Sequence, residues 1–343
     1  MEQVFFAGID AHVASLQIAV VSQRGEPVLE TRVSTKDPAR VLDTLAPFRP
    51  LHAVVQTCPV WPWIYDLLVP AGIQFHLAHA KALRLIAIST RKTDEGDAML
   101  LARMLAMGLI PAVYAKPAPQ RDVLALLRHR ARLVRHRTSF ANRIHAQLHA
   151  VRLSLPREQL LRVSTRAWLK ETAWPRLSRE QRCLVRTHLT LIRTLTRLVR
   201  SLDVRICARA SGSANAQLLQ TIPGIGPYRG LLLATELAPI CRFPDAAHVA
   251  SYAGLAPTVR NSGNVTHTGP IPRSANRQVR GALVSAIPTH LRFAPDSALS
   301  QSYRQLNARV GWQVARVATA RKLSAIVYRM LVTGEQWRAS PPM

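Results

Sequence analysis

Short apolar runs separated by polar turns fill the first 80 residues and predict a mixed α/β domain. The runs have the length of strands, and the turn from Arg24 to Pro27 suits a hairpin between the second and third of them. The predicted strands cover residues 4–9, 15–22, 28–33, 51–56 and 73–77, and an apolar helix covers 61–69. Strands first, then strands alternating with helices, indicate a mixed sheet of about five strands with helices packed on it.

From residue 94 onward the apolar positions recur at helical spacing. We expect helices over 94–107, 121–151, 181–207 and 297–334. Residues 211–215 have the composition of a linker, and a second, mainly helical domain is expected after it. The predicted division is 1–115 for the α/β domain, 116–210 for a basic helical region and 216–338 for the C-terminal domain.

Leucines at mixed three- and four-residue spacing run along the helix predicted over 181–207. They are Leu184, Leu191, Leu195, Leu198 and Leu202. This is the spacing of the a and d positions of a coiled coil. It fits association with a second chain and fits a helical hairpin packing on itself equally well.

The charge balance points to a polyanionic partner. The chain has 46 Lys and Arg residues against 19 Asp and Glu, a formal net charge of +27. Such a field attracts nucleic acid by counterion release, largely without sequence preference. The alternative is a solvated basic surface in a protein that favours Arg. The helix over 121–151 contributes Arg128, Arg135 and Arg143 to this charge.

Cysteine usage and hydropathy exclude several classes of protein. Cys58, Cys183, Cys207 and Cys241 lie far apart and form no C-x-x-C pair, so a zinc site or a disulfide framework is not expected. No apolar run reaches the length of a membrane span. We expect a cytoplasmic protein with reduced thiols and no membrane partner.

Carboxylates in this basic chain indicate a metal site. Asp10 ends the first apolar run, VFFAGID, where an RNase H-like sheet offers a carboxylate to a metal ion. Asp94 and Asp97 lie three residues apart at a predicted helix start, so they share one helix face. Together the three could hold Mg²⁺ for phosphoryl transfer. The alternative is that Asp94 only complements the helix dipole, which leaves Asp10 and Asp97 unexplained.

The stretch LQTIPGIGPY, residues 219–228, is a helix-hairpin-helix signature. Gly224 and Gly226 keep the turn free of side chains, so backbone N–H groups at the next helix start can meet a phosphate. The alternative is a tight turn between two helices without a ligand.

A candidate nucleophile, Ser262, is expected in a polar, flexible loop between Asn261 and Gly263. A serine that attacks a phosphodiester needs positive charge at the phosphate, and nearby cations could supply it. They are Arg260, Arg273, Arg277 and Arg280. From the residues alone, a serine beside glycine is far more often a turn residue.

The motifs, in this order, resemble those of the DEDD transposases of the insertion-sequence "one-ten" family, the bridge-RNA-guided recombinases. The resemblance is collinear over almost the whole chain. It includes GIDAH, WIYDLLVPAGIQFHLAHA, RKTDEGDAMLLARML, RIHAQLH, TIPGIGPYRGLLLATEL, ASYAGLAPTVRNSGN and ANRQVRGALV. It implies an N-terminal RuvC-like domain of RNase H fold, a helical insertion for assembly and RNA binding, and a C-terminal transposase domain.

The resemblance also implies the chemistry. Asp10, Asp94 and Asp97 would be metal-ligating carboxylates for Mg²⁺, and Ser262 the nucleophile that forms a phosphoserine link to DNA. The partners would be DNA at the element ends and target site, a non-coding guide RNA and further copies of the chain in a dimer or tetramer.

Three positions depart from the family pattern. Gln56 stands at the end of the strand before WIYDLL, where the family has an acidic residue, and Pro272 and Ala275 stand where Thr and Gly are expected. A neutral ligand weakens a cation site. Two other hypotheses therefore remain beside an active recombinase. One is a relic that binds nucleic acid only, and the other is a Mg²⁺-dependent junction resolvase or nuclease in which Ser262 is structural.

Overall fold

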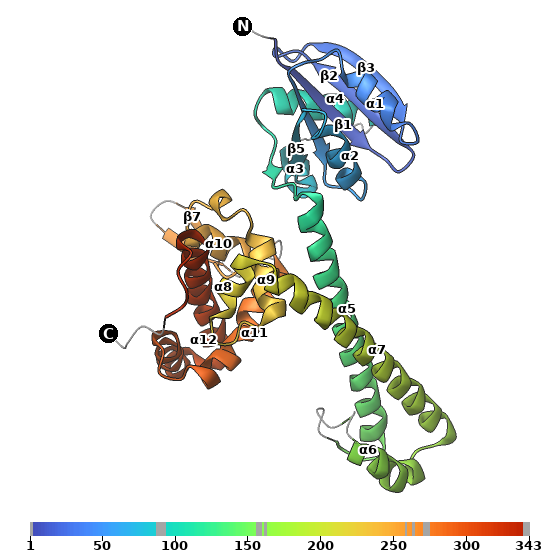
Figure 1. Ribbon diagram of the computed structural model, residues 1–343, viewed down its shortest axis with the longest axis vertical. Helices are drawn as coiled ribbons and strands as arrows, with labels where there is room; N and C mark the ends of the chain where they lie inside the picture. Colours follow the sequence, from blue (N-terminus) through green and yellow to red (C-terminus); the bar gives the residue numbers. More distant parts are fainter. Residues whose placement is uncertain are drawn as a thin grey trace. The chain divides into compact units, whose positions relative to one another are not determined.

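The chain forms two compact units, Met1–Arg121 and Asp122–Met343. The computed structural model describes residues 3–86, 94–155, 160, 163–257, 259–262, 265–269 and 275–338 (Figure 1). The predicted boundary at residue 115 lies close to this division. The predicted middle region, 116–210, lies mostly within the second unit, and its existence as a separate domain stays a prediction.

The first unit is built on a six-stranded mixed sheet with the order β3-β2-β1-β4-β5-β6. Its strands are β1 (Phe5–Ala11), β2 (Ser15–Val21), β3 (Pro27–Ser34), β4 (Leu51–Gln56), β5 (Gln74–Ala78) and β6 (Ala112–Val113). Strand β1 is antiparallel to β2 and parallel to β4, which in turn is parallel to β5. The five predicted strands are all present, and a short sixth strand lies where we expected only a break between helices.

Helices cover both faces of this sheet. On one face, α1 (Pro38–Leu45) and α2 (Trp61–Leu68) pack on Ala7, Ile9 and Val55. On the other, α3 (Ala80–Ile86) and α4 (Asp94–Ala106) pack on Phe6 and Val54. Residues Ala98, Leu101, Ala102 and Leu105 are buried, at the spacing of one helix face. Helices α1 and α3 were not expected from the sequence.

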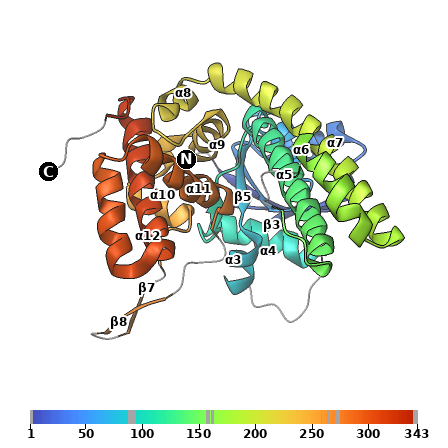
Figure 2. The same cartoon turned by 90° about the horizontal axis from the view of Figure 1, so that it is seen from below.

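In the second unit, two long helices run side by side (Figures 1 and 2). They are α5 (Ala118–Ala150) and α7 (Arg179–Ser211). A short α6 (Val163–Trp168), a π turn (Leu169–Ala173) and a 3₁₀ turn (Trp174–Arg176) connect them. Ser178 begins α7 with a capping box, since its hydroxyl accepts from Gln181 N–H at 3.1 Å and its own N–H donates to the Gln181 side chain at 2.9 Å.

The helical hairpin packs on itself through residues other than the predicted leucines. Val185, Leu189 and Ile192 of α7 form a core with Ile144 and Leu148 of α5. By contrast, Leu184, Leu191 and Leu198 are 46%, 37% and 45% exposed. The leucine stripe therefore lies on a different side of α7 from the face that packs within the chain.

The remaining helices form a compact body around one apolar core. They are α8 (Ala214–Gln220), α9 (Pro227–Leu237), a 3₁₀ turn (Ile240–Arg242), α10 (Ala246–Tyr252), α11 (Arg277–Phe293) and α12 (Ala298–Thr333). The predicted linker is a tight connection, because Gly212 caps the end of α7 and Ser213 caps the start of α8. The last helix is broken at Gly311, whose φ is 78°.

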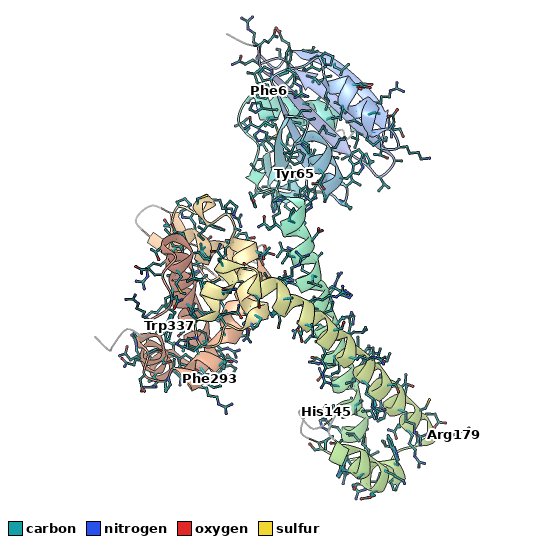
Figure 3. All side chains as sticks on the ribbon, viewed as in Figure 1. Phe6, Tyr65, His145, Arg179, Phe293 and Trp337 are labelled. Carbon is teal, nitrogen blue, oxygen red and sulfur yellow. The ribbon has the colours of Figure 1, made fainter. Side chains whose placement is uncertain are left out.

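Two strands interrupt this otherwise helical body. β7 (Val259–Ser262) pairs antiparallel with β8 (Val265–Thr268), with Ser262 opposite Val265. After α12 the chain returns to the core, where Trp337 (labelled in Figure 3) packs edge-on against His290 at 5.7 Å. Among the described residues, no helix is long and apolar enough to cross a membrane.

Candidate functional site

Asp10 and Gln56 lie at the same edge of the first unit's sheet. Strands β1 and β4 are parallel, and Ile9 pairs with Val55 at the last recorded step of their register. One residue further along each strand come Asp10 and Gln56. Because parallel neighbours in register project to the same side about 4.8 Å apart, the two side chains lie next to each other on one face of the sheet. Gln56 ends β4 as predicted, whereas β1 runs one residue beyond Asp10, to Ala11.

Asp10 has an immediate partner that the sequence analysis missed. His12 Nε2 lies 3.0 Å from Asp10 Oδ2, with 51% of the His12 side chain and 16% of the Asp10 side chain exposed. The sequence GIDAH could have indicated this pair, because Asp10 and His12 are two residues apart and side chains at that spacing in a strand project to the same side. An imidazole beside a carboxylate can orient it or move a proton at it.

Gly8 brings helix α4 against strand β1. A Cβ added at Gly8 would lie 2.1 Å from the Ala98 carbonyl oxygen and 2.5 Å from the Ala102 nitrogen. Only glycine permits so close an approach of the two backbones. Asp97 immediately precedes Ala98, and Asp10 comes two residues after Gly8. The first turn of α4 is therefore held beside the strand that carries Asp10.

The donor set at this edge has the chemistry of a hard-cation site. Asp10 and Asp97 offer carboxylate oxygens and Gln56 a carbonyl oxygen, which are the ligand types that Mg²⁺ takes. Asp94 is the first residue of α4, and its side chain lies outside the described residues. Among the side chains that are described, no group of three or more His, Cys, Asp or Glu is placed to hold a metal. The residues fit Mg²⁺ by type.

In the second unit, the PGIG turn precedes α9 as the sequence predicted. Gly224 has a φ of 96°, and a Cβ there would lie 2.6 Å from the Ala286 carbonyl oxygen of α11. Gly226 is the N-cap of α9, and a Cβ there would meet nothing within 4 Å. Gly224 is thus required for packing and the left-handed turn, whereas Gly226 leaves the start of α9 open.

Buried His290 holds this turn in place. Its Nδ1 lies 2.9 Å from the Pro223 carbonyl oxygen, and its Nε2 lies 2.9 Å from Ser297 Oγ. Burial lowers the pKa of His290, against a smaller opposing effect of its bond to Pro223. The neutral imidazole is the form that this pocket favours.

A cationic groove opens at the start of α9. Its volume is about 700 Å³, and α5, α9 and α11 form its walls. The charged and aromatic residues that line it are Arg130, Arg135, Tyr228, Arg229 and Arg277. Helix α9 begins with Pro227, which has no N–H, and no side chain caps its start. The positive charge and the uncapped helix start could together accept an anion. We refer to it below as the α9 groove.

The arginines of the α9 groove differ in how freely they can meet a ligand. Arg130 forms an ion pair with Asp203, with nitrogen–oxygen distances of 2.9 and 3.3 Å, and lies 4.8 Å over the Tyr228 ring. Arg229 donates to Ser285 and to the Gly224 carbonyl, and burial lowers its pKa. Within the described part of the chain, Arg135 and Arg277 make no ion pair or side-chain hydrogen bond, and both are exposed.

The remaining predicted cations have other surroundings. Arg128 is paired with the buried Glu236 at 2.9 Å, a partner that the sequence analysis missed. Arg143 lies 5.4 Å over the Phe140 ring, eight residues along α5 from Arg135. Arg280 is half-buried in the first turn of α11. Arg273 lies outside the described residues. A nucleic-acid role for each of them stays a prediction.

Ser262 is the last residue of β7 rather than part of an irregular loop, which corrects the expected local structure. Arg260 lies in the same strand and pairs with His267. Residues 263 and 264, between the two strands, lie outside the described residues. The backbone of Ser262 is thus paired with Val265 of β8, at the end of β7 next to the connection between the two strands.

Comparisons with known proteins show transposases among those similar to this chain. Residues 216–303 match the family described as Transposase IS116/IS110/IS902 family, and residues 7–152 match a second transposase family of the DEDD type. The chain is 25% identical to the transposase for insertion sequence element IS1111A of Coxiella burnetii, over 98% of this chain and 92% of that protein. It is 24% identical to the transposase for insertion sequence element IS1328 of Yersinia enterocolitica, over 85% of each chain. It is also 28% identical to the pilin gene-inverting protein of Moraxella bovis, over 60% of this chain and 54% of that protein.

Proposed function

Because the chain belongs to the IS110/IS116/IS902 family of insertion-sequence transposases, we propose that it cuts and rejoins DNA through a phosphoserine intermediate at Ser262. One observation carries the proposal beyond family membership. The β1–β4 register and the Gly8 contact bring Asp10, Gln56 and the first turn of α4 to one sheet edge. This is the arrangement expected of an RNase H-like site for phosphoryl transfer.

The reaction is a transfer of the phosphoryl group to and from serine. Ser262 Oγ attacks the phosphorus, the new Oγ–P bond forms, and the bond from phosphorus to the leaving deoxyribose oxygen breaks. The proton of Oγ passes to a base, and the leaving oxygen takes up a proton. Reversal with a different DNA end rejoins the strands and frees the serine. The Asp10–His12 pair is a candidate for holding one of these protons.

Asp10, Asp94 and Asp97 would hold Mg²⁺, with the Gln56 carbonyl oxygen as a neutral fourth donor. When bound, the ion supplies positive charge at the phosphate oxygens. Gln56 makes the site one charge less negative than a full set of four carboxylates. We therefore propose that this chain binds Mg²⁺ more weakly than a Gln56→Glu variant does.

The α9 groove is proposed to hold the phosphate backbone of DNA or of a guide RNA, in the manner of a helix-hairpin-helix. Support comes from its lining of Arg135 and Arg277 and from the open N-terminus at Gly226. Contacts of this kind recognise the charge of the phosphates and do not distinguish one base from another. Sequence choice would then come from pairing with the RNA.

A homo-oligomer is proposed on the exposed leucine stripe of α7. Leu184, Leu191 and Leu198 repeat every seven residues on one side of the helix, and the half-buried Leu195 and Leu202 fill the alternating positions. This is an a/d seam with no partner inside the described part of the chain. A second copy of α7 offers the matching seam.

The test is a covalent adduct on a denaturing gel. The protein is incubated with Mg²⁺, RNA from the element's flanking region and matching DNA, beside Ser262→Ala, Ser274→Ala as a serine control and Gln56→Glu. An adduct from the wild type that only Ser262→Ala abolishes supports the proposal. An adduct from Gln56→Glu alone indicates a decayed transposase. Cleavage that persists in Ser262→Ala without any adduct indicates a nuclease and refutes the serine mechanism.

A further inference from the structure

A buried carboxylate, Glu236, lies at the base of the segment that carries Ser262. Glu236 is in α9, and its side chain is 0% exposed. The segment follows Tyr252, the last residue of α10, and ends before Asn276, the N-cap of α11. Its first residues stay in the helical core, where Ala253 and Leu255 are buried. A buried carboxylate is costly unless it is hydrogen-bonded, so the partners of Glu236 show which elements its burial ties together.

Each Glu236 oxygen has a partner from a different element. Arg128 of α5 donates to Oε1 at 2.9 Å, and the Tyr252 hydroxyl donates to Oε2 at 3.2 Å. The same hydroxyl accepts from Asn276 Nδ2 at 3.0 Å. The Asn276 backbone N–H donates to the Tyr252 carbonyl at 2.9 Å. The two ends of the Ser262 segment are therefore tied to each other and, through Tyr252, to Glu236.

The directions of these bonds make them mutually dependent. The Tyr252 hydroxyl has one proton, which it gives to the carboxylate, and so it can only accept from Asn276. The Asn276 side-chain oxygen in turn accepts from the N–H groups of Gln278 and Val279 and begins α11. Removing the one hydroxyl breaks the bond to Glu236 and the side-chain bond to Asn276 together.

The ring of Tyr252 is fixed independently of its hydroxyl. It stands edge-on to Phe243 at 5.4 Å, and the Arg242 guanidinium lies 5.0 Å over it. Arg242 also donates to the Glu236 backbone carbonyl at 2.7 Å. A phenylalanine at this position would keep the packing and lose only the hydrogen bonds. The hydroxyl's contribution can therefore be separated from that of the ring.

We propose that Glu236, Tyr252 and Arg128 are positioning residues for the transposition reaction. Together with the buried Ala253 and Leu255, they tie the two ends of segment 253–275 to the helical body and so help to set where β7 lies. Arg128 also joins this base to α5, since its Nε donates to Gln278 of α11 at 3.2 Å. The inference rests on the proposed function of Ser262 for its catalytic consequence, but not for the anchoring itself.

The test compares Tyr252→Phe with Tyr328→Phe. Tyr328 of α12 is the matched control, because its hydroxyl also has two hydrogen-bonding partners. It shares its one proton between the carbonyls of Phe243 at 3.3 Å and Pro244 at 3.1 Å. The first readout is amide hydrogen exchange of the full-length protein. We expect exchange in peptides from 253–275 to be about ten-fold faster in Tyr252→Phe and unchanged in Tyr328→Phe.

The second readout is the single-turnover rate of adduct formation, measured beside the affinity for DNA. A misplaced nucleophile costs rate rather than binding, so we expect Tyr252→Phe to lower the rate about 10- to 100-fold at unchanged affinity. Glu236→Gln should act in the same direction, because its amide cannot accept on both sides. A merely structural role would lower the melting temperature and the affinity together.

The outcomes separate this inference from the proposed function. Equal exchange in Tyr252→Phe and wild type overturns the anchoring, whatever the activity. Faster exchange with an unchanged adduct rate overturns the positioning role. If wild type and Gln56→Glu form no adduct, the serine mechanism fails and the catalytic consequence fails with it, while the exchange result still decides the anchoring.

Discussion

Removing Arg135 and Arg277 together should flatten the salt dependence of nucleic-acid binding. These two arginines line the α9 groove and, among the described residues, have no ion pair or side-chain hydrogen bond of their own. Arg130 and Arg229, on the same walls, are already paired with Asp203 and with Ser285. The free pair should therefore release most of the counterions that binding in the groove displaces.

The expected magnitude follows from counting phosphates. Each lost phosphate contact with duplex DNA lowers the slope of log K against log[salt] by about 0.9. Arg135→Ala with Arg277→Ala should thus reduce the slope by about 1.8. Between 50 and 200 mM salt, a four-fold change, the wild type should lose about 12-fold more affinity than the double variant.

Fluorescence anisotropy with a labelled duplex, repeated across this salt range, measures the slope. The control is Arg176→Ala with Arg179→Ala, which removes the same charge at the start of α7. That end lies about 36 Å along the helix from Asp203, which faces the groove arginine Arg130. Equal slopes for the two double variants would refute the assignment of the groove and leave only a diffuse charge effect.

Three further predictions test other parts of the fold. Gly8→Ala places a Cβ against the rigid backbone of α4 and should lower the free energy of unfolding of the first unit by about 3 kcal/mol or more. Gly281→Ala has open space around it and should cause no such loss, which urea denaturation followed by circular dichroism can measure for both variants. Because burial lowers the pKa of His290, the folded protein binds fewer protons than the unfolded chain, so the contribution of His290 to the free energy of unfolding is full above about pH 6.5 and is lost as the pH falls below that value. From pH 8 to 5 the stability of the wild type should therefore fall more steeply than that of His290→Gln, and parallel curves would contradict this. Leu191→Glu should reduce the oligomer mass seen by light scattering with little change in chain stability, while Val204→Glu, exposed but off the leucine stripe, should leave the mass unchanged.

Much of the fold follows from local patterns in the sequence. The five strands, α2, α4 and the long α5 and α7 appear close to their predicted bounds, because apolar periodicity records which face of an element is buried. Asp10 and Gln56 could be located at strand ends for the same reason. Helix α1 has the same length as α2 but was missed because it is far less apolar. Strand β6 was missed because it has only two residues, and β7 and β8 because their polar residues carry no alternating apolar pattern.

The tertiary structure alone decided which side chains are paired and which are free. Nothing in the run of arginines along α5 distinguishes Arg128 and Arg130, which meet Glu236 and Asp203, from Arg135, which faces the open groove. Arg128 and Glu236 are 108 residues apart in the chain, so their ion pair depends on how α5 and α9 pack. In the same way, the buried face of α7 is chosen by the shape of α5, which leaves the leucine stripe outside. Periodicity is a property of each helix by itself, whereas a partner is a property of two elements, and only the folded chain brings those together.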